Sequence, residues 1–205
     1  RLDRIDRYFR GEHDLPYMPD SAEAEYKELA ERCITNWMPL LVDTPAQGLY
    51  VDNFRKAGAT PVEAAERGAE WQTWQRSLLA ARQNAIYVDA LKFGHSFILS
   101  EKDAKGQVTH KGLSARRTVA LYEDAATDVD PVAAVYVKRW AKDRDPGILQ
   151  VWDGDFRYEM LYISGEDPVE IGAIPHDSGE CPVTPFSAFK DLEGRTWGVI
   201  EPFIT

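Results

Sequence analysis

The chain has 205 residues, of which 44% are hydrophobic and 28% are charged. This is the composition of an ordinary globular protein that can bury a substantial core. The formal net charge is −10 at pH 7, which argues against a chain that grips DNA, because non-specific duplex binding depends on a basic face. The sequence also lacks an apolar run of the ~20 residues that cross a membrane and a signal peptide.

The N-terminal part of the chain carries helical patterns. In residues 1–10, apolar side chains recur at steps of three or four, which predicts a short amphipathic helix. Residues 20–37 form the next predicted helix, which Asp20 caps and a following proline ends. Residues 44–48 then indicate a turn, and residues 49–54 indicate a strand.

The clearest helix start is Thr60-Pro61-Val62-Glu63, which combines a threonine cap, a proline in the first turn and a glutamate three residues later. One long amphipathic helix is predicted from here to Phe93, where Gly94 ends it. Its apolar face follows steps of three and four and comprises Trp71, Trp74, Leu78, Ala81, Ala85 and Val88.

Beyond Gly94 the pattern is that of strands. Asp153-Gly154 is a strong hairpin signal, and the three β-rich runs between residues 133 and 163 predict an antiparallel meander. Prolines beside two later runs suit edge strands. The expected strands are 95–100, 108–110, 118–122, 133–140, 148–152, 156–163, 169–171 and 183–186. Helices followed by antiparallel strands predict an α+β fold.

Residues of catalytic or metal-binding type are scattered. The four histidines, His13, His95, His110 and His176, lack the close spacing of a metal motif. His176 and Cys181 lie five residues apart across a glycine turn, and we interpret them as a turn residue and a packed residue. The serines lack a nucleophile elbow, and no glycine-rich phosphate loop precedes a helix. We therefore expect no catalytic residue, no metal and no cofactor.

Three further features have plain structural interpretations. Cys33 and Cys181 are predicted to be free thiols of a reducing compartment, with a single disulfide as the alternative. The acidic residues 123–130 lack the central glycine and closing glutamate of a calcium loop, which favours a solvated turn. Aromatic side chains on helix and strands are predicted to pack in the core: Trp71, Trp74, Trp140, Trp152, Tyr158 and Tyr162.

A series of short motifs occurs along the chain in one order. They are Tyr8-x-x-Gly11 with Leu15-Pro16, Asn36-Trp37 with Leu41-Val42-Asp43, Trp71 to Trp74 followed by Gly94-x-Ser96-Phe97, His176-x-x-Gly179-x-x-Pro182-Val183, Asp191-Leu192-x-Gly194, and Gly198-x-Ile200-Glu201-Pro202-x-Ile204. This order resembles that of portal proteins of tailed bacteriophages, the head-to-tail connectors, and in particular those of long-tailed actinobacterial phages and prophages.

The resemblance implies that residues 1–205 are a single wing domain from the N-terminal portion of a portal protein. Residues 1–94 would be mainly helical, residues 95–190 mainly β, and residues 191–205 would lead into the stem helix of a longer protein. The subunit would join a ring, usually a dodecamer, at one capsid vertex. Double-stranded DNA would pass through the ring during packaging and ejection without sequence-specific binding.

The same resemblance implies the partners and the location of the protein. Terminase large subunit, head–tail adaptor, capsid and scaffold proteins would dock on the ring. The protein would be found in the virion, and in the host bacterial cytoplasm during assembly, with no membrane partner and no enzymatic activity. By their position next to the stem, Glu193, Arg195, Trp197 and Glu201 are expected to form a subunit contact or a hinge.

Two other classes of function stay open at the level of sequence. One is a small hydrolase or transferase with a site around His176 and His95, which would need a pocket of perturbed titratable groups. The other is a monomeric ligand-binding domain that uses its aromatic residues.

Overall fold

The computed structural model describes residues 1–205 apart from 15–16, 22, 55–57, 59–67, 144 and 205. Its helices are α1 (Leu2–Phe9), α2 (Ala24–Arg32), α3 (Met38–Gly48), α5 (Ala69–Arg76), α6 (Leu79–Phe93) and the short 3₁₀ helix η1 (Glu201–Phe203). Its strands are β1 (His95–Lys102), β2 (Val108–Leu113), β3 (Thr118–Leu121), β4 (Ala133–Arg139), β5 (Gly147–Trp152), β6 (Phe156–Tyr162), β7 (Val169–Pro175), β8 (Val183–Ser187), β9 (Phe189–Lys190) and β10 (Thr196–Trp197).

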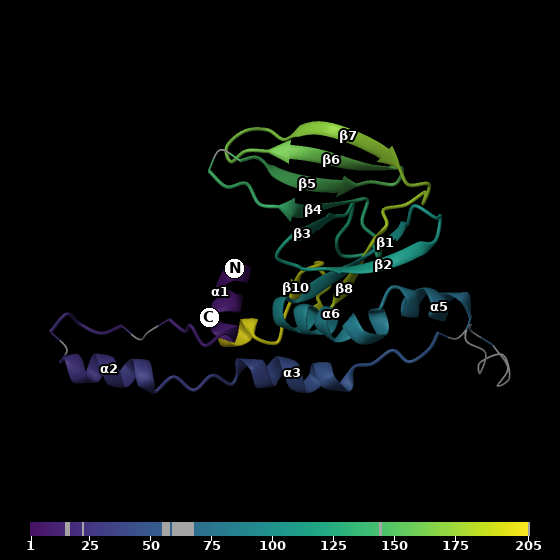
Figure 1. Ribbon diagram of the computed structural model, residues 1–205. Helices are drawn as coiled ribbons and strands as arrows, with labels where there is room; N and C mark the ends of the chain where they lie inside the picture. The colour runs from purple at the N-terminus through teal and green to yellow at the C-terminus, as the bar shows by residue number, and fades with distance from the viewer. Residues whose placement is uncertain (15–16, 22, 55–57, 59–67, 144, 205) are drawn as a thin grey trace.

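Helices and two antiparallel sheets form three layers, which confirms the predicted α+β class. The five-stranded sheet has the order β3-β4-β5-β6-β7, and the three-stranded sheet has the order β2-β1-β8. Figure 1 shows α5 and α6 beneath the three-stranded sheet and the five-stranded sheet above it. The predicted meander is therefore present, and β7 and β8 are edge strands, as the flanking prolines indicated.

Alternation along β1 connects the layers, because successive side chains of a strand point to opposite faces. Phe97 and Leu99 pack toward the five-stranded sheet, where they meet the fully buried Trp152. Ile98, between them, packs on the helix side against Trp74. The predicted core roles of Trp71, Trp74 and Trp152 are thus confirmed.

Trp140 departs from its expected role in the core. It follows the last residue of β4 and is 55% exposed. A position just beyond a strand is no longer held against the facing layer. The β-rich pattern of residues 133–140 therefore did not predict the exposure of Trp140. Tyr158 and Tyr162 are partly buried on β6.

The region between residues 20 and 54 differs most from its prediction. The helix α2 begins after Glu23, not at Asp20, and ends at Arg32. Residues 38–48 form helix α3, which includes residues 44–48, where a turn was expected. Pro39 lies in the first turn of α3, where a missing backbone N–H costs nothing, so this proline begins a helix and does not end one.

The strand expected over residues 49–54 is absent from this described segment. The side-chain amide of Gln83 takes the place of a neighbouring strand. Its Oε1 accepts the N–H of Val51 at 2.8 Å, and its Nε2 donates to the carbonyl of Val51 at 3.4 Å. Gln83 is buried in α6, and since a buried amide must be hydrogen-bonded, it holds this segment against the helix.

The single long helix is in fact two helices, α5 and α6. Leu78 adopts a left-handed backbone with φ of 59° between them. The break shifts the phase of the second helix, so the predicted positions Ala81 and Ala85 are exposed while Leu79 and Ile86 are buried. The predicted end at Gly94 is confirmed. The proposed start at residues 60–63 lies outside the described residues.

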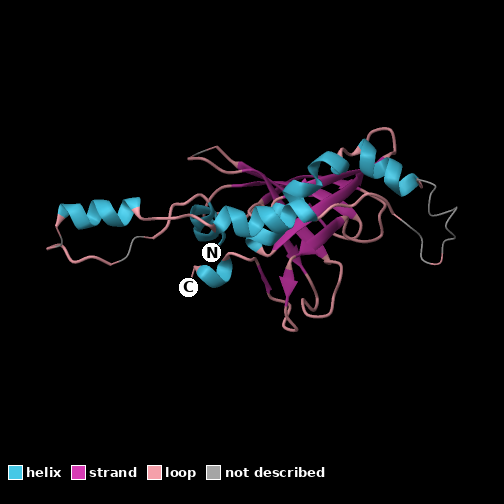
Figure 2. Ribbon diagram, turned by 90° about the horizontal axis from the view of Figure 1, so that it is seen from below, coloured by secondary structure: helices cyan, strands magenta, loops and turns pink. Residues whose placement is uncertain are grey.

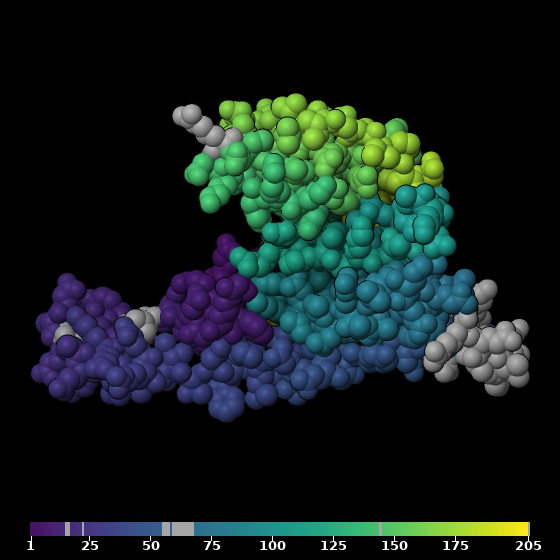
Figure 3. Space-filling view, viewed as in Figure 1, coloured from purple at the N-terminus to yellow at the C-terminus, as the bar shows by residue number. Residues whose placement is uncertain are grey.

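The segment that contains α2 projects from the body of the molecule. The three views in Figures 1, 2 and 3 show α2 at one end, beyond α1 and α3. None of the residues of α2 is buried. Within the part of the chain that the structure describes, no helix combines the length and the apolarity needed to cross a membrane.

Candidate functional site: the C-terminal segment and its anchorage

Residues 188–204 leave β8, form the short hairpin β9–β10 and end in η1 beside α1 (Figure 1). This segment includes residues 191–204 of the predicted lead-in, residues 191–205, whose last residue lies outside the described residues. Three sets of contacts hold it to the rest of the molecule, and they decide which of its residues remain available to another protein.

A close crossing of two backbones makes the first set. The N–H of Ala188 donates to the carbonyl of Gly94 at 3.0 Å, and the N–H of Val199 donates to that of Leu91 at 2.8 Å. Gly94 has φ of 95°, and a Cβ added there would lie 2.6 Å from the carbonyl carbon of Trp197. A Cβ on Gly198 would collide with the carbonyl oxygens of Leu91 and Lys92. Only glycine permits this approach.

An apolar cluster makes the second set. Ile200 is fully buried and Ile204 is nearly so, and both pack with Ile5 of α1, Val42 of α3 and Phe93 of α6. The end of the described chain is therefore part of the core, joined to the N-terminal helix.

Polar contacts of Arg1 make the third set, at the same place. Its guanidinium bonds Glu201 at 2.6 Å and the carbonyl of Thr196 at 2.7 Å. Both groups of this ion pair are partly exposed, so the pair adds little stability in water. It nevertheless ties the N-terminus to η1.

A charged cluster holds α1, the helix against which the segment packs, to Lys92 of α6 and to Arg116. The carboxylate of Asp6, 11% exposed, accepts a short hydrogen bond from the ammonium of Lys92, which is 10% exposed. Arg116 reaches the same carboxylate at 3.0 Å and Arg10 at 2.8 Å. Burial by itself would raise the pKa of Asp6, but the hydrogen bond and charge of Lys92, with the charges of Arg116 and Arg10, hold that pKa below its ordinary value.

The four residues expected to form a contact or hinge fall into two groups. Glu193 and Arg195 lie at the hairpin tip, where both are largely exposed and only 3.7 Å apart. Trp197 stacks on Phe189 with ring centres 6.0 Å apart, and Glu201 is engaged by Arg1. The side chains of Glu193 and Arg195 are accessible to another molecule, whereas those of Trp197 and Glu201 make contacts within the chain.

The acidic residues 123–130 form the turn that was predicted, and this turn packs against the hairpin. Asp124 accepts the N–H of Ala126 and the hydroxyl of Thr127, both at 2.9 Å. The ammonium of Lys190 donates to the carbonyl of Asp128 at 3.3 Å. The carboxylates thus organise their own loop, and the described residues contain no cluster of potential metal ligands.

His176 is a turn residue whose two ring nitrogens both have local partners. Nδ1 accepts the N–H of Ser178 at 3.3 Å, so Nε2 carries the proton and donates to the carbonyl of Asp153 at 3.1 Å. Cys181 is buried, and its thiol approaches the carbonyl of Trp152 at 3.9 Å. Burial raises the pKa of this thiol. Both cysteines are free thiols, as predicted, and Cys33 is exposed.

One serine–histidine contact is present on the three-stranded sheet. Ser100 Oγ and His110 Nδ1 lie 2.9 Å apart, and burial, with the nearby charge of Arg76, lowers the pKa of His110. Among the described residues no carboxylate bonds this histidine. The arrangement therefore lacks the group that orients the base in acyl-transfer enzymes. His95 instead meets Thr196 at 3.1 Å.

Sequence reasoning missed the charged residues that hold α1, the helix against which the segment packs. Asp6, Lys92 and Arg116 come from three separate parts of the chain, and no local pattern links them. One signal was present, because Lys92 interrupts the apolar run before Gly94. A buried lysine needs a partner of opposite charge.

These features define a structural domain, built from two sheets and a helical layer around a firmly held C-terminal segment. Among protein families, the model described as "Phage portal protein, SPP1 Gp6-like" matches residues 1–205. The chain belongs to this phage portal protein family, and its general role is that of a structural portal protein of the virion. Comparison with curated proteins gave no match.

Proposed function

We propose that residues 1–205 are the outer wing domain of a portal subunit, and that the ring it joins conducts double-stranded DNA during packaging and ejection. The observation that carries this proposal is the family match over residues 1–205. The order of motifs, of the long-tailed actinobacterial type, supports it. The proposed ring is a dodecamer whose stem helix continues from residues 191–205.

The proposed partners are the terminase large subunit, the head–tail adaptor, and the capsid and scaffold proteins. Assembly would take place in the host bacterial cytoplasm. The role is mechanical, and catalysis would belong to the motor that docks on the ring. The acidic net charge of −10 supports a wing that does not hold the passing DNA.

The experiment that tests the proposal is negative-stain electron microscopy of the complete protein at micromolar concentration. We expect rings with a central channel wide enough for duplex DNA. Small uniform particles at every concentration would overturn the proposal, and turnover screening with a His176→Ala control would then take priority.

The hairpin tip is proposed as a subunit contact in this ring. Glu193 and Arg195 are exposed and form only a weak pair with each other, so both can engage a neighbour. Reversing both charges in the complete protein should impair ring formation without lowering the melting temperature. Intact rings from this variant would show that the tip is not a contact.

A further inference from the structure

A second surface lies far from the hairpin tip, at the end of the molecule where α2 projects. We call residues 17–37 the arm, of which residue 22 is not described. Its largest apolar side chains are exposed: Tyr17 by 92%, Tyr26 by 63%, Leu29 by 56% and Trp37 by 62%. Tyr26 and Leu29 are three residues apart in α2 and so share one face.

The arm has little to hold it within its own subunit. An isolated helix of fewer than about twelve residues is marginal in water, and helices in proteins owe most of their stability to packing. The helix α2 buries none of its residues. Its one salt bridge to a residue that the structure describes, between Glu28 and Arg32, lies within the helix and is exposed. A partner surface is therefore needed to explain both the exposed face and the helix itself.

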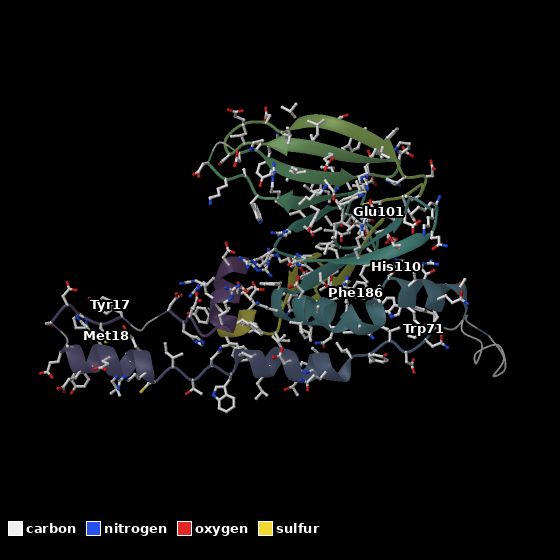
Figure 4. The ribbon with its side chains drawn as sticks, viewed as in Figure 1. Tyr17, Met18, Trp71, Glu101, His110 and Phe186 are labelled. Atoms are coloured by element: carbon white, nitrogen blue, oxygen red, sulfur yellow. The ribbon has the colours of Figure 1, made fainter. Side chains whose placement is uncertain are left out.

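A groove toward the opposite end of the molecule has an apolar lining that matches the exposed apolar side chains of the arm. It lies between α5 and the three-stranded sheet and has a volume of about 460 Å³. Its lining is mainly apolar, with Phe54, Trp74, Ile98, Val108 and Phe186 among the contributing residues. Figure 4 shows Tyr17 and Met18 at one end of the molecule, and His110 and Phe186, which line the groove, toward the other.

The charges of the two surfaces are complementary. The arm carries Asp20 and four glutamates against Lys27 and Arg32. Beside the groove lie Arg76 and Lys102, with Lys105 in the adjoining turn between β1 and β2. None of the three forms a salt bridge with a residue that the structure describes, although the charges of Arg76 and Lys105 act on Asp103. Lys102 is the cross-strand partner of Val108 and so shares the face of the groove. Glu70 and Asp103 reduce this positive charge but do not cancel it.

The relative placement of arm and groove fits a ring. Head-to-tail contacts require two different surfaces on each subunit, one complementary to the other. In Figures 1 and 3 the arm projects at one end of the molecule, and α5, which borders the groove, lies at the other. An isologous dimer would not need this separation.

We propose that the arm of one copy of this chain docks into the groove between α5 and the three-stranded sheet of a neighbouring copy, with Tyr26 and Leu29 as its apolar anchors. This inference rests on the proposed function, since it identifies a contact within the portal ring. It assigns to the arm a partner of defined chemistry, a second copy of the chain.

The first test truncates the anchors in the complete protein. The double variant Tyr26→Ala/Leu29→Ala should raise the concentration at half-assembly by about tenfold or more, measured by sedimentation velocity, because buried aromatic anchors carry much of an interface's affinity. The matched control is Val169→Ala/Ile171→Ala, which removes two exposed apolar side chains of β7. Equal assembly of the arm and control variants would overturn the proposal.

The second test is a mixing experiment that depends on the head-to-tail geometry. Thr184→Glu places a negative charge in the groove, where Thr184 is exposed, and should block an acidic arm. At a concentration just above that of wild-type half-assembly, the arm and groove variants should each remain monomeric, whereas their mixture should form hybrid dimers that do not grow. The dimer would use the intact arm of one variant and the intact groove of the other. A mixture without dimers would contradict the contact.

The outcomes separate this inference from the proposed function. Both substitutions alter exposed positions, so unchanged melting temperatures will show that the variants fold. Wild-type rings together with intact rings from the arm variant would remove the arm contact alone. Wild-type protein that stays monomeric at all concentrations would remove both proposals.

Discussion

At the scale of single residues, the anchorage of the C-terminal segment depends on two backbones that approach each other more closely than a residue with a Cβ would allow. Gly94 and Gly198 permit two backbones to cross at the end of α6. Nearby, Asp6 and Lys92 form an ion pair that water barely reaches. Removing one partner of such a pair is costly, because the other is left buried with an uncompensated charge.

Gly198→Ala should destabilise the chain by about 2–3 kcal/mol, since the new methyl group must displace the carbonyls of Leu91 and Lys92. Denaturant unfolding followed by circular dichroism will measure the change. Gly172→Ala is the control, because a Cβ there meets no atom within 4 Å. Similar stabilities for both variants would refute the close crossing.

Asp6→Asn should destabilise the chain by about 3 kcal/mol at pH 7, because Lys92 then keeps a buried charge without its counter-ion. Asp3→Asn is the control, since the Asp3 side chain is 86% exposed although it pairs with the same Arg116; we expect a change below about 1 kcal/mol there.

The pH dependence of the Asp6 contribution has a definite sign. The pKa of Asp6 is lower in the folded chain than its ordinary value of 3.8. Its stabilising contribution is therefore complete above pH 3.8 and is lost as the pH falls through the lower, folded-state pKa. The difference in unfolding free energy between wild type and Asp6→Asn should shrink in that acidic range. A difference that is constant with pH would contradict the ion pair.

At the scale of elements, a single left-handed residue decides how the helical layer packs. Leu78 separates α5 from α6 and sets which side chains of α6 face the sheet. The periodic pattern assumes an unbroken helix. It therefore predicted the burial of Trp71 and Trp74 correctly, but beyond the break it no longer matched the positions that are buried. The exposed Leu78 gains little from packing and occupies a left-handed backbone region that disfavours residues with a Cβ.

Leu78→Gly should therefore leave the chain as stable as wild type or stabilise it by up to about 1 kcal/mol. Ala85→Gly, at an exposed position inside α6, should destabilise it by about 1 kcal/mol. Thermal unfolding of the two variants will compare these effects. A loss of stability in Leu78→Gly equal to that in Ala85→Gly would mean that the left-handed geometry carries no strain.

At the scale of the whole molecule, the charge and the proposed arm and groove at opposite ends fit the proposed ring component through which DNA would pass. The chain carries an excess of ten acidic groups, and affinity for duplex DNA requires phosphate neutralisation. Contacts between protein copies, at the hairpin tip and at the arm, are where we expect binding energy to be concentrated.

The 205-residue chain should not bind a fluorescent duplex with a Kd tighter than about 10 µM at physiological salt, and any binding should vanish as salt is raised. Fluorescence anisotropy over a series of salt concentrations will measure this. Sub-micromolar binding with a steep salt dependence would instead identify a phosphate-binding face and weaken the interpretation of a non-gripping conduit.

The sequence by itself determined the features that local chemistry encodes. Asp153-Gly154 marked the hairpin between β5 and β6, where Asp153 Oδ1 accepts the N–H groups of Asp155 and Phe156, and Gly94 marked the end of α6. Each of these signals acts within a few residues of chain, so it can be read in order. The order of short motifs likewise indicated the portal family.

The remaining features were decided by the tertiary structure alone, because they depend on contacts between groups that are distant in the chain. Whether Pro39 ends a helix or begins one depended on the burial of Val42 and Ala46 against other elements. The extended segment at Val51 became a partner of Gln83 and not of a strand. The ion pair between α1 and α6 joins Asp6 to Lys92, 86 residues away. Such contacts are selected by packing, and no local pattern specifies them.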